Sequence, residues 1–208
     1  MVEAKEASVM FPGQGSQKVG MGGELYKSSL GHVQDILGLA EETLQNQFGW
    51  ERSLQDVSLN GPGEYLNNTL RAQPLIYTLS AAALVATREQ GTVPVAAVGH
   101  SLGEYAAGFA MGMFDFGDGL TAVGLRAQAM DEASKIRPGA MVAALGIDLD
   151  KANQICESVK GHMPDCVLTV ANINSPRQII ISGDQAAVIA SLTLITEADG
   201  VARLLPVT

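Results

Sequence analysis

A glycine-rich turn between an apolar run and a helix-forming run constrains the fold of this 208-residue chain more than any other feature. The turn reads Gly-His-Ser-Leu-Gly at residues 99–103 and fits the pattern G-x-S-x-G. Residues 93–98 before it are rich in valine, which favours a strand, and residues 104–113 after it favour a helix. A buried strand that turns directly into a helix is typical of an α/β fold, in which helices cover a sheet.

The same turn predicts a nucleophilic serine. A sharp strand-to-helix turn exposes the Ser101 hydroxyl, and the flanking glycines Gly99 and Gly103 allow the backbone to pass closely. The amino end of the following helix favours the negative charge of an oxyanion. The alternative is a structural turn with an ordinary N-cap serine, but the strand before it and the helix after it favour the nucleophile.

Composition and charge exclude several classes of protein. Hydrophobic residues make up 47% of the chain and charged residues 17%, which excludes a disordered chain. Thirteen Lys and Arg against 22 Asp and Glu leave a net charge of −9, which disfavours nucleic acid as a partner. No long apolar run predicts a membrane span, and the acidic start is unlike a secretory signal. We expect a cytoplasmic protein, or a plastid or mitochondrial matrix protein after removal of a transit peptide.

Cysteines and histidines give no sign of a metal site. Cys156 and Cys166 are expected to be reduced, buried thiols, as is usual in an intracellular chain. His32, His100 and His162 lie far apart in the sequence and lack the spacing of metal ligands. We therefore expect neither a metal nor a cofactor.

The first 137 residues form one expected domain with only two recognisable strands, at residues 7–11 and 93–98. A loop rich in glycine follows the first strand at residues 12–17. Helices are predicted at 32–47, from Pro74 in a first turn to about residue 90, at 104–113, and at 115–136 with Asp115 as N-cap. Two strands are few for a sheet that must carry this many helices.

Residues 138–208 form the second expected domain. Strands are predicted at 140–145, 166–172, 178–182 and 201–207, with helices at 148–160 and 184–198. This β-α-β-β-α-β order is that of a ferredoxin-like unit. The chain stops inside or just after the last predicted strand, so we expect a truncated carboxyl end.

Four ordered motifs resemble the malonyl-CoA:acyl carrier protein transacylase family, a group of acyltransferases. They are Phe-Pro-Gly-Gln-Gly-Ser-Gln at 11–17, Gly-His-Ser-Leu-Gly-Glu at 99–104, Arg126 in a helix, and Asn-Ile-Asn-Ser-Pro at 172–176 with Ile-Ser-Gly at 181–183. The resemblance implies an α/β-hydrolase-like large domain with an inserted ferredoxin-like subdomain. It also implies malonyl-CoA and acyl carrier protein as partners, in fatty-acid biosynthesis, and a monomer when full length.

The resemblance also implies roles for individual residues. Ser101 would take the malonyl group from coenzyme A as an ester and pass it to the phosphopantetheine thiol of the carrier protein. The backbone N–H groups of Gln14 and Leu102 would form the oxyanion hole. Arg126 would bind the malonyl carboxylate through its two-pronged guanidinium, a task for which lysine is less suited. Asn172 would lie near the site.

The chain departs from the family in its general base. The family's base is a histidine shortly after the last strand of the insert, which would fall just beyond Thr208. We assign this role to none of the three histidines present. His100 is expected to point away from Ser101, His162 to lie in a loop between a helix and a strand, and His32 on an early helix. This chain alone is therefore expected to be inactive.

Two other functions stay open at this point. A serine esterase or thioesterase would use water in place of the carrier thiol, but it would not need Arg126 to hold a second carboxylate. An inactive fragment, or a paralogue that only binds a carrier protein, would agree with the missing histidine. The resemblance implies an acidic carrier protein, so docking to this acidic chain would need a basic face. The candidate residues for that face are Lys135, Arg137, Lys151 and Arg177.

Overall fold

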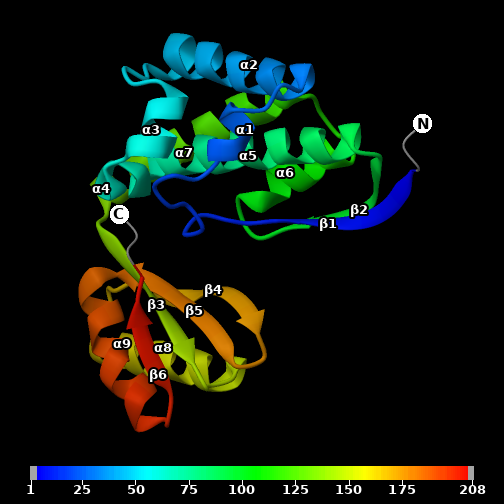
Figure 1. Ribbon diagram of the computed structural model, residues 1–208. Coiled ribbons are helices and arrows are strands. Elements are labelled where there is room, and N and C mark those ends of the chain that lie inside the picture. The colour runs from blue at the N-terminus through cyan, green and yellow to red at the C-terminus, as the bar shows by residue number, and fades with distance from the viewer. Residues whose placement is uncertain (1–3, 206–208) are drawn as a thin grey trace. The chain divides into compact units, whose positions relative to one another are not determined.

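Strands and helices occur in both parts of the chain, so the predicted α/β class is confirmed (Figure 1). A computed structural model describes residues 4–205. The chain divides into two units, Met1–Met130 and Asp131–Thr208. The long helix α7 (Phe116–Ile136) crosses this division, and the domain boundary between residues 137 and 138 stays a prediction. The end of the strand predicted at 201–207 lies outside the described residues, as does Thr208.

The described sheet of the first unit has two parallel strands, β1 (Lys5–Phe11) and β2 (Thr92–Gly99). They confirm the strands predicted at 7–11 and 93–98. Because the strands are parallel, their carboxyl ends lie at the same edge, where Phe11 is opposite Gly99. Figure 1 shows the two strands side by side below α5 and α6. The glycine-rich loop and the G-x-S-x-G turn therefore both begin at one edge of the sheet.

Helix α5 (Thr69–Glu89) is the most buried helix of the first unit, because alanine, leucine and isoleucine occupy nearly all of its sides. The Asn68 side chain caps its start by accepting a hydrogen bond from the Leu70 N–H at 2.9 Å. None of the described helices combines the length and apolar character that crossing a membrane requires. The other helices here are α1 (Gly23–Tyr26), α2 (Gly31–Phe48), α3 (Leu54–Asn60), α4 (Gly63–Asn67) and α6 (Gly103–Ala110).

Two predicted helix boundaries in this unit are wrong. Helix α5 begins at Thr69, because the Asn68 cap starts it early, so Pro74 lies in the second turn and not in the first. Helix α6 ends at Ala110 and not at residue 113, because Gly112 turns the chain into the left-handed region with a φ of 70°. The N-cap predicted before α7 is confirmed, since the Asp115 side chain accepts a hydrogen bond from the Asp118 N–H at 2.8 Å.

One face of the described two-stranded sheet is apolar and open. Met10 and Val98 are neighbours in the register and are 82% and 60% exposed. On the opposite face, Val9 and Phe11 pack into the core that α5 and α6 share. Strand side chains alternate between faces, so the apolar residues of the open face have no cover from the described part of the first unit.

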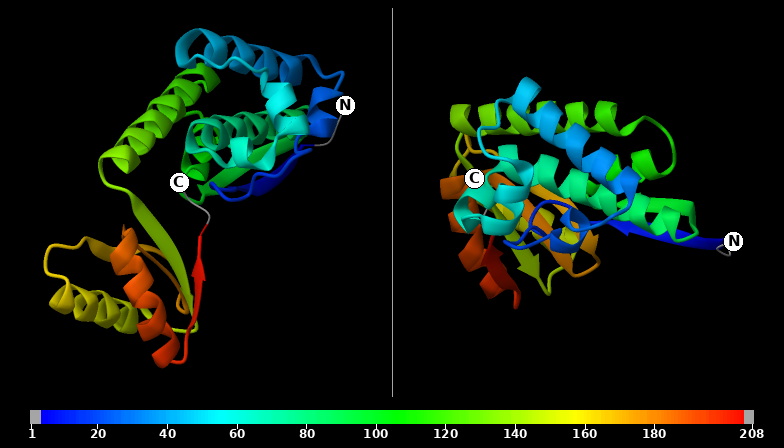
Figure 2. Two further views of the ribbon diagram at one scale, coloured as in Figure 1. Left: turned by 90° about the vertical axis from the view of Figure 1, so that its left-hand side faces the viewer. Right: turned by 45° about the horizontal axis from the view of Figure 1, so that its top comes forward.

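The second unit runs in the predicted β-α-β-β-α-β order. Its strands form one antiparallel sheet with the strand order β4-β5-β3-β6. Apolar residues of β3 and β5 share one core with both helices. Figure 2 shows the ribbon of this unit, with α8 and α9 beside its strands. The elements are β3 (Gly139–Leu145), α8 (Leu149–His162), β4 (Leu168–Ser175), β5 (Gln178–Asp184), α9 (Gln185–Glu197) and β6 (Val201–Leu204).

His162 ends helix α8, so the prediction that it lies in a loop is wrong. Its Nδ1 is 2.8 Å from the carbonyl oxygen of Ser158, one turn earlier, and this contact extends the helix. Both cysteines of this unit are free, but the prediction that both are buried is wrong for Cys166, which is only half-buried. Cys156 is buried, and burial raises the pKa of its thiol.

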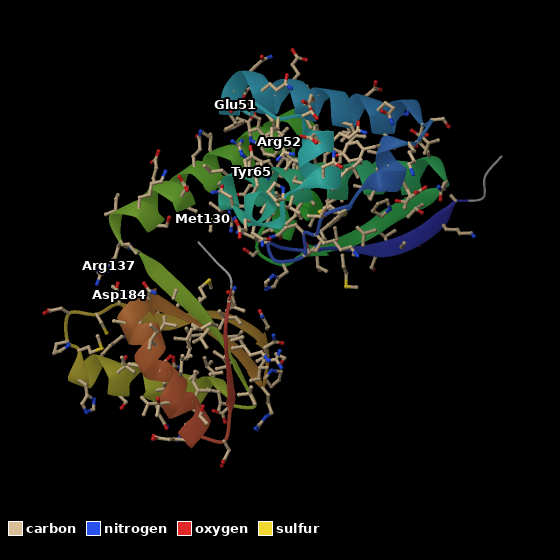
Figure 3. The ribbon with its side chains drawn as sticks, turned by 60° about the vertical axis from the view of Figure 1, so that its left-hand side comes forward. Glu51, Arg52, Tyr65, Met130, Arg137 and Asp184 are labelled. Carbon is tan, nitrogen blue, oxygen red and sulfur yellow. The ribbon has the colours of Figure 1, made fainter. Side chains whose placement is uncertain are left out.

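An ion pair between Arg137 and Asp184 connects the first residue after α7 with the start of α9 (Figure 3). The guanidinium donates to both carboxylate oxygens, at 2.5 and 2.7 Å, and to the carbonyl oxygen of Asp165 at 3.1 Å. The Val167 N–H donates to the same carboxylate at 2.8 Å. These contacts, the Arg137 hydrogen bonds first, lower the pKa of Asp184 from 3.8 to about 2.

The lowered pKa predicts an acid-sensitive second unit. A carboxylate whose pKa is lower in the folded state stabilises the fold fully above its unfolded pKa and loses that effect as the pH falls toward 2. The free energy of unfolding, measured with urea, should fall between about pH 5 and about pH 2.5 in the wild type. We expect this fall to be smaller in Asp184→Asn, which has no carboxylate to protonate. Glu197→Gln, at the other end of α9, is the control. An unchanged pH profile in Asp184→Asn would contradict this assignment.

Candidate active site

The G-x-S-x-G turn forms a strained elbow between β2 and α6. Ser101 has a φ of 52°, in the left-handed region that residues other than glycine rarely adopt. Three backbone hydrogen bonds of 2.9–3.1 Å hold the turn: His100 N–H donates to Phe11, Gly103 N–H to His100, and Glu104 N–H to Ser101. The serine is exposed at the tip, as the sequence pattern predicts.

Glycines allow the elbow to lie directly against the loop that follows β1. A methyl group on Gly103 would overlap the carbonyl of Phe11, and one on Gly13 would overlap the carbonyl of His100. A methyl group on Gly99 would overlap the backbone of Gly103 within the elbow itself. The two backbone segments are therefore in contact at positions where any side chain would separate them.

Two backbone N–H groups near Ser101 are free to bind an oxyanion. Within the described residues, neither the Gln14 N–H nor the Leu102 N–H donates a hydrogen bond, although their neighbours Ser16, Gly15 and Gly103 do. Leu102 stands at the amino end of α6, where the helix dipole favours negative charge. The family resemblance implies the oxyanion-hole role for these two groups, and that role stays a prediction.

Arg126 reaches Ser101 from α7. Its Nη2 donates to the Ser101 Oγ at 3.1 Å, and its Nη1 donates to the amide oxygen of Gln73 on α5. The side chain is half-buried, and no carboxylate among the described residues lies within ion-pair distance of it. A positive charge without a counter-ion therefore sits beside the serine.

A buried polar pair, Thr69 and Gln73, was not predicted from the sequence. Gln73 donates to the Thr69 Oγ1 at 2.7 Å, and Thr69 donates to the side-chain oxygen of Gln14 at 3.3 Å. Both residues lie in the first turns of α5 and are buried. A glutamine beside proline in an otherwise apolar helix is the signal that could have identified it, since buried polar groups need partners.

Asn172 and the histidines are placed as follows. Asn172 lies half-buried on β4 of the second unit, opposite Ile180, and its functional role stays a prediction. The His100 ring lies with Nδ1 close to Gly13, while His32 pairs with Glu89 at 2.9 Å. No group of three or more His, Cys, Asp and Glu within residues 4–205 could hold a metal ion.

The family profile described as acyl transferase domain matches residues 9–207. The chain belongs to this family. The resemblance carried by the four motifs is thereby confirmed.

Two relatives of this acyl transferase domain are named for the same activity. The malonyl CoA-acyl carrier protein transacylase of Bacillus subtilis is 38% identical over 199 residues, which are 95% of this chain and 59% of that protein. The protein of the same name from Staphylococcus aureus strain MRSA252 is 36% identical over 183 residues, or 88% of this chain and 56% of that protein. The chain therefore spans less than two thirds of the length of these relatives.

Solved structures resemble this acyl transferase domain along nearly its whole length. One similar structure is a chain of the complex between a type II PKS acyl-carrier protein and its malonyl-transacylase. Its comparison with this chain gives a TM-score of 0.85 at 32% identity and covers 98% of this chain and 63% of the other chain. The acyl-carrier-protein S-malonyltransferase of Burkholderia pseudomallei gives 0.84 at 33% identity, with the same coverage.

The close backbone contact at the elbow predicts a large cost for a single methyl group. We expect Gly103→Ala to lower the free energy of unfolding by about 1–3 kcal/mol, because the methyl group would force the elbow away from Phe11. Gly38→Ala, on the open side of α2, is the matched control and should be neutral or stabilising by up to about 1 kcal/mol. Equal stability of the two variants in urea unfolding would refute the contact.

Proposed function

We propose that this chain carries the nucleophile and the substrate-binding arginine of a malonyl-CoA:acyl carrier protein transacylase. The observation that carries the proposal is the hydrogen bond from the Arg126 guanidinium to the hydroxyl of the strained elbow serine, Ser101. A nucleophile and an unpaired cation at this distance suit an acyl group that ends in a carboxylate. The names of the relatives from Bacillus subtilis and Staphylococcus aureus support the same activity.

The proposed reaction has two half-reactions. The Ser101 Oγ attacks the thioester carbonyl of malonyl-CoA and loses its proton to a base. The carbonyl oxygen becomes an oxyanion, which the Gln14 and Leu102 N–H groups stabilise, and the coenzyme A thiolate leaves. The phosphopantetheine thiol of the carrier protein then attacks the seryl ester, and Ser101 leaves with a proton. No cofactor takes part in either step, since coenzyme A arrives and departs with the substrate.

Arg126 cannot serve as the base, because a guanidinium stays protonated in proteins. Its proposed role is to bind the malonyl carboxylate. When the acyl group enters, the carboxylate would replace the Ser101 hydroxyl as acceptor of the Nη2 hydrogen bond. A hydrolase of uncharged esters has no group to place there, so the unpaired charge argues against the esterase alternative.

The proposal extends to the fold and to the partner. The antiparallel order β4-β5-β3-β6 supports a ferredoxin-like subdomain, and the elbow supports an α/β-hydrolase-like large domain. Two of the four candidate residues for the basic face that would bind the carrier protein are neutralised. Lys135 pairs with Asp131, and Arg137 pairs with Asp184. Lys151 and Arg177 remain its candidate residues in the second unit, although Arg177 also donates to the carbonyl of Gly146.

The proposal predicts that Arg126 selects for acyl groups with a carboxylate. A charge-assisted pair is worth about 1.5–3 kcal/mol, so Arg126→Ala should lower malonyl transfer by roughly ten- to a hundredfold or more. Acetyl transfer should not fall with it. The assay uses a chimera in which the C-terminal remainder of the Bacillus subtilis relative follows residue 208.

Two controls make this assay decisive. Arg126→Lys keeps the charge without the guanidinium fork and should fall between the wild type and Arg126→Ala in malonyl transfer. Ser101→Ala should abolish the transfer of both acyl groups. A parallel loss of acetyl and malonyl transfer in Arg126→Ala would make Arg126 structural and contradict the proposal.

A further inference from the structure

Arg126 is held in place by an amide and not by an acid. Its Nη1 donates to the Gln73 side-chain oxygen, whereas Arg52 and Arg137 each pair with an aspartate at 2.5–2.7 Å. Acidic residues outnumber basic ones by 22 to 13 in this chain, so carboxylate partners are not scarce. The neutral partner leaves the full positive charge of Arg126 beside Ser101.

The orientation of the Gln73 amide follows from its other partners. Its Nε2 has two hydrogens, one for the Thr69 Oγ1 at 2.7 Å and one for the Met130 Sδ at 3.3 Å. The Thr69 hydroxyl has one hydrogen, which it donates to the Gln14 side-chain oxygen, so it can only accept from Gln73. The Gln73 oxygen must therefore face Arg126, whose guanidinium has only donors.

Burial makes this arrangement costly to change. Gln73 is 0% exposed and Thr69 is 3% exposed, so a flipped amide would leave buried donors facing each other without water to compensate. Met130 lies one turn after Arg126 on α7, and its labelled position on that helix is visible in Figure 3. The amide thus joins α5 to α7 at the one turn that carries the guanidinium.

We propose that Thr69 and Gln73 are positioning residues that direct the Arg126 guanidinium toward Ser101 and, being uncharged, reserve its charge for the carboxylate of the acyl group. This inference rests on the proposed function, because it assigns the acyl carboxylate as the ligand of Arg126. The pair acts through Arg126 and touches no reacting atom itself.

Three substitutions separate the two parts of this role. Gln73→Glu keeps the size of the side chain but supplies a charged partner, which should neutralise Arg126. Thr69→Val keeps the shape but removes the hydroxyl, so the Gln73 amide loses the partner that fixes its orientation. Thr69→Ser restores the hydroxyl and should restore the wild-type behaviour. Gln55→Glu, on the exposed side of α3, is the control for added charge.

The experiment is a titration of the 208-residue chain with malonate and with acetate, followed by NMR of the Arg126 side-chain nitrogens, which Arg126→Lys assigns. In the wild type, the guanidinium signals should be resolved and should respond to malonate at lower concentration than to acetate. Gln73→Glu should weaken the malonate response about tenfold or more, as expected for a competing charged partner. Thr69→Val should broaden the signals before any ligand is added, and Thr69→Ser should not.

The outcomes distinguish this inference from the proposed function. A malonate response that is unchanged in Gln73→Glu, or signals that are unchanged in Thr69→Val, would overturn the inference while the proposed function stands. If the guanidinium signals broaden in Thr69→Val but the wild-type signals do not respond to malonate, the result would count against the proposed function and the carboxylate assignment. Only the positioning contact would then remain. Loss of structure in a variant would appear across the whole spectrum and not at Arg126 alone.

Discussion

The contact on which the site depends is the one between the loop after β1 and the elbow after β2. Parallel pairing places Phe11 opposite Gly99, so both segments leave the sheet at the same edge. They can touch only because Gly13 and Gly103 have no side chains. This contact holds the elbow, in which Ser101 has a φ of 52°, directly against the loop that contains Gln14.

The uncompensated charge of Arg126 is the second feature on which the site depends. Five lysines and arginines of the described residues pair with a nearby carboxylate, as Arg137 does with Asp184 in the second unit. Arg126 is held by the neutral Gln73 and faces a neutral hydroxyl. A guanidinium that is held in place without a counter-ion is prepared to bind an anion, because no internal carboxylate must be released first. The site therefore combines a strained nucleophile with a reserved positive charge.

The sequence predicted the parts that follow local patterns. Apolar runs and glycines located β1, β2 and the elbow, and the order of elements from residue 139 onward is as expected. It failed where a particular side-chain hydrogen bond decides the outcome, whether the partner is near or distant in sequence. The start of α5 depends on the Asn68 cap, and the end of α8 depends on the contact between His162 and Ser158. The link between Gln73 and Arg126 joins two helices and has no local pattern at all.

The account's central claim is that Ser101 accepts an acyl group while Arg126 holds its carboxylate. The most direct measurement is peptide mass spectrometry of the chimera with the Bacillus subtilis C-terminal remainder, after incubation with malonyl-CoA and, separately, acetyl-CoA. The account predicts a malonyl ester on the peptide that contains Ser101, formed in preference to an acetyl ester, and the preference should disappear in Arg126→Ala. Acylation at another residue, or an equal preference for both acyl groups in the wild type, would contradict it.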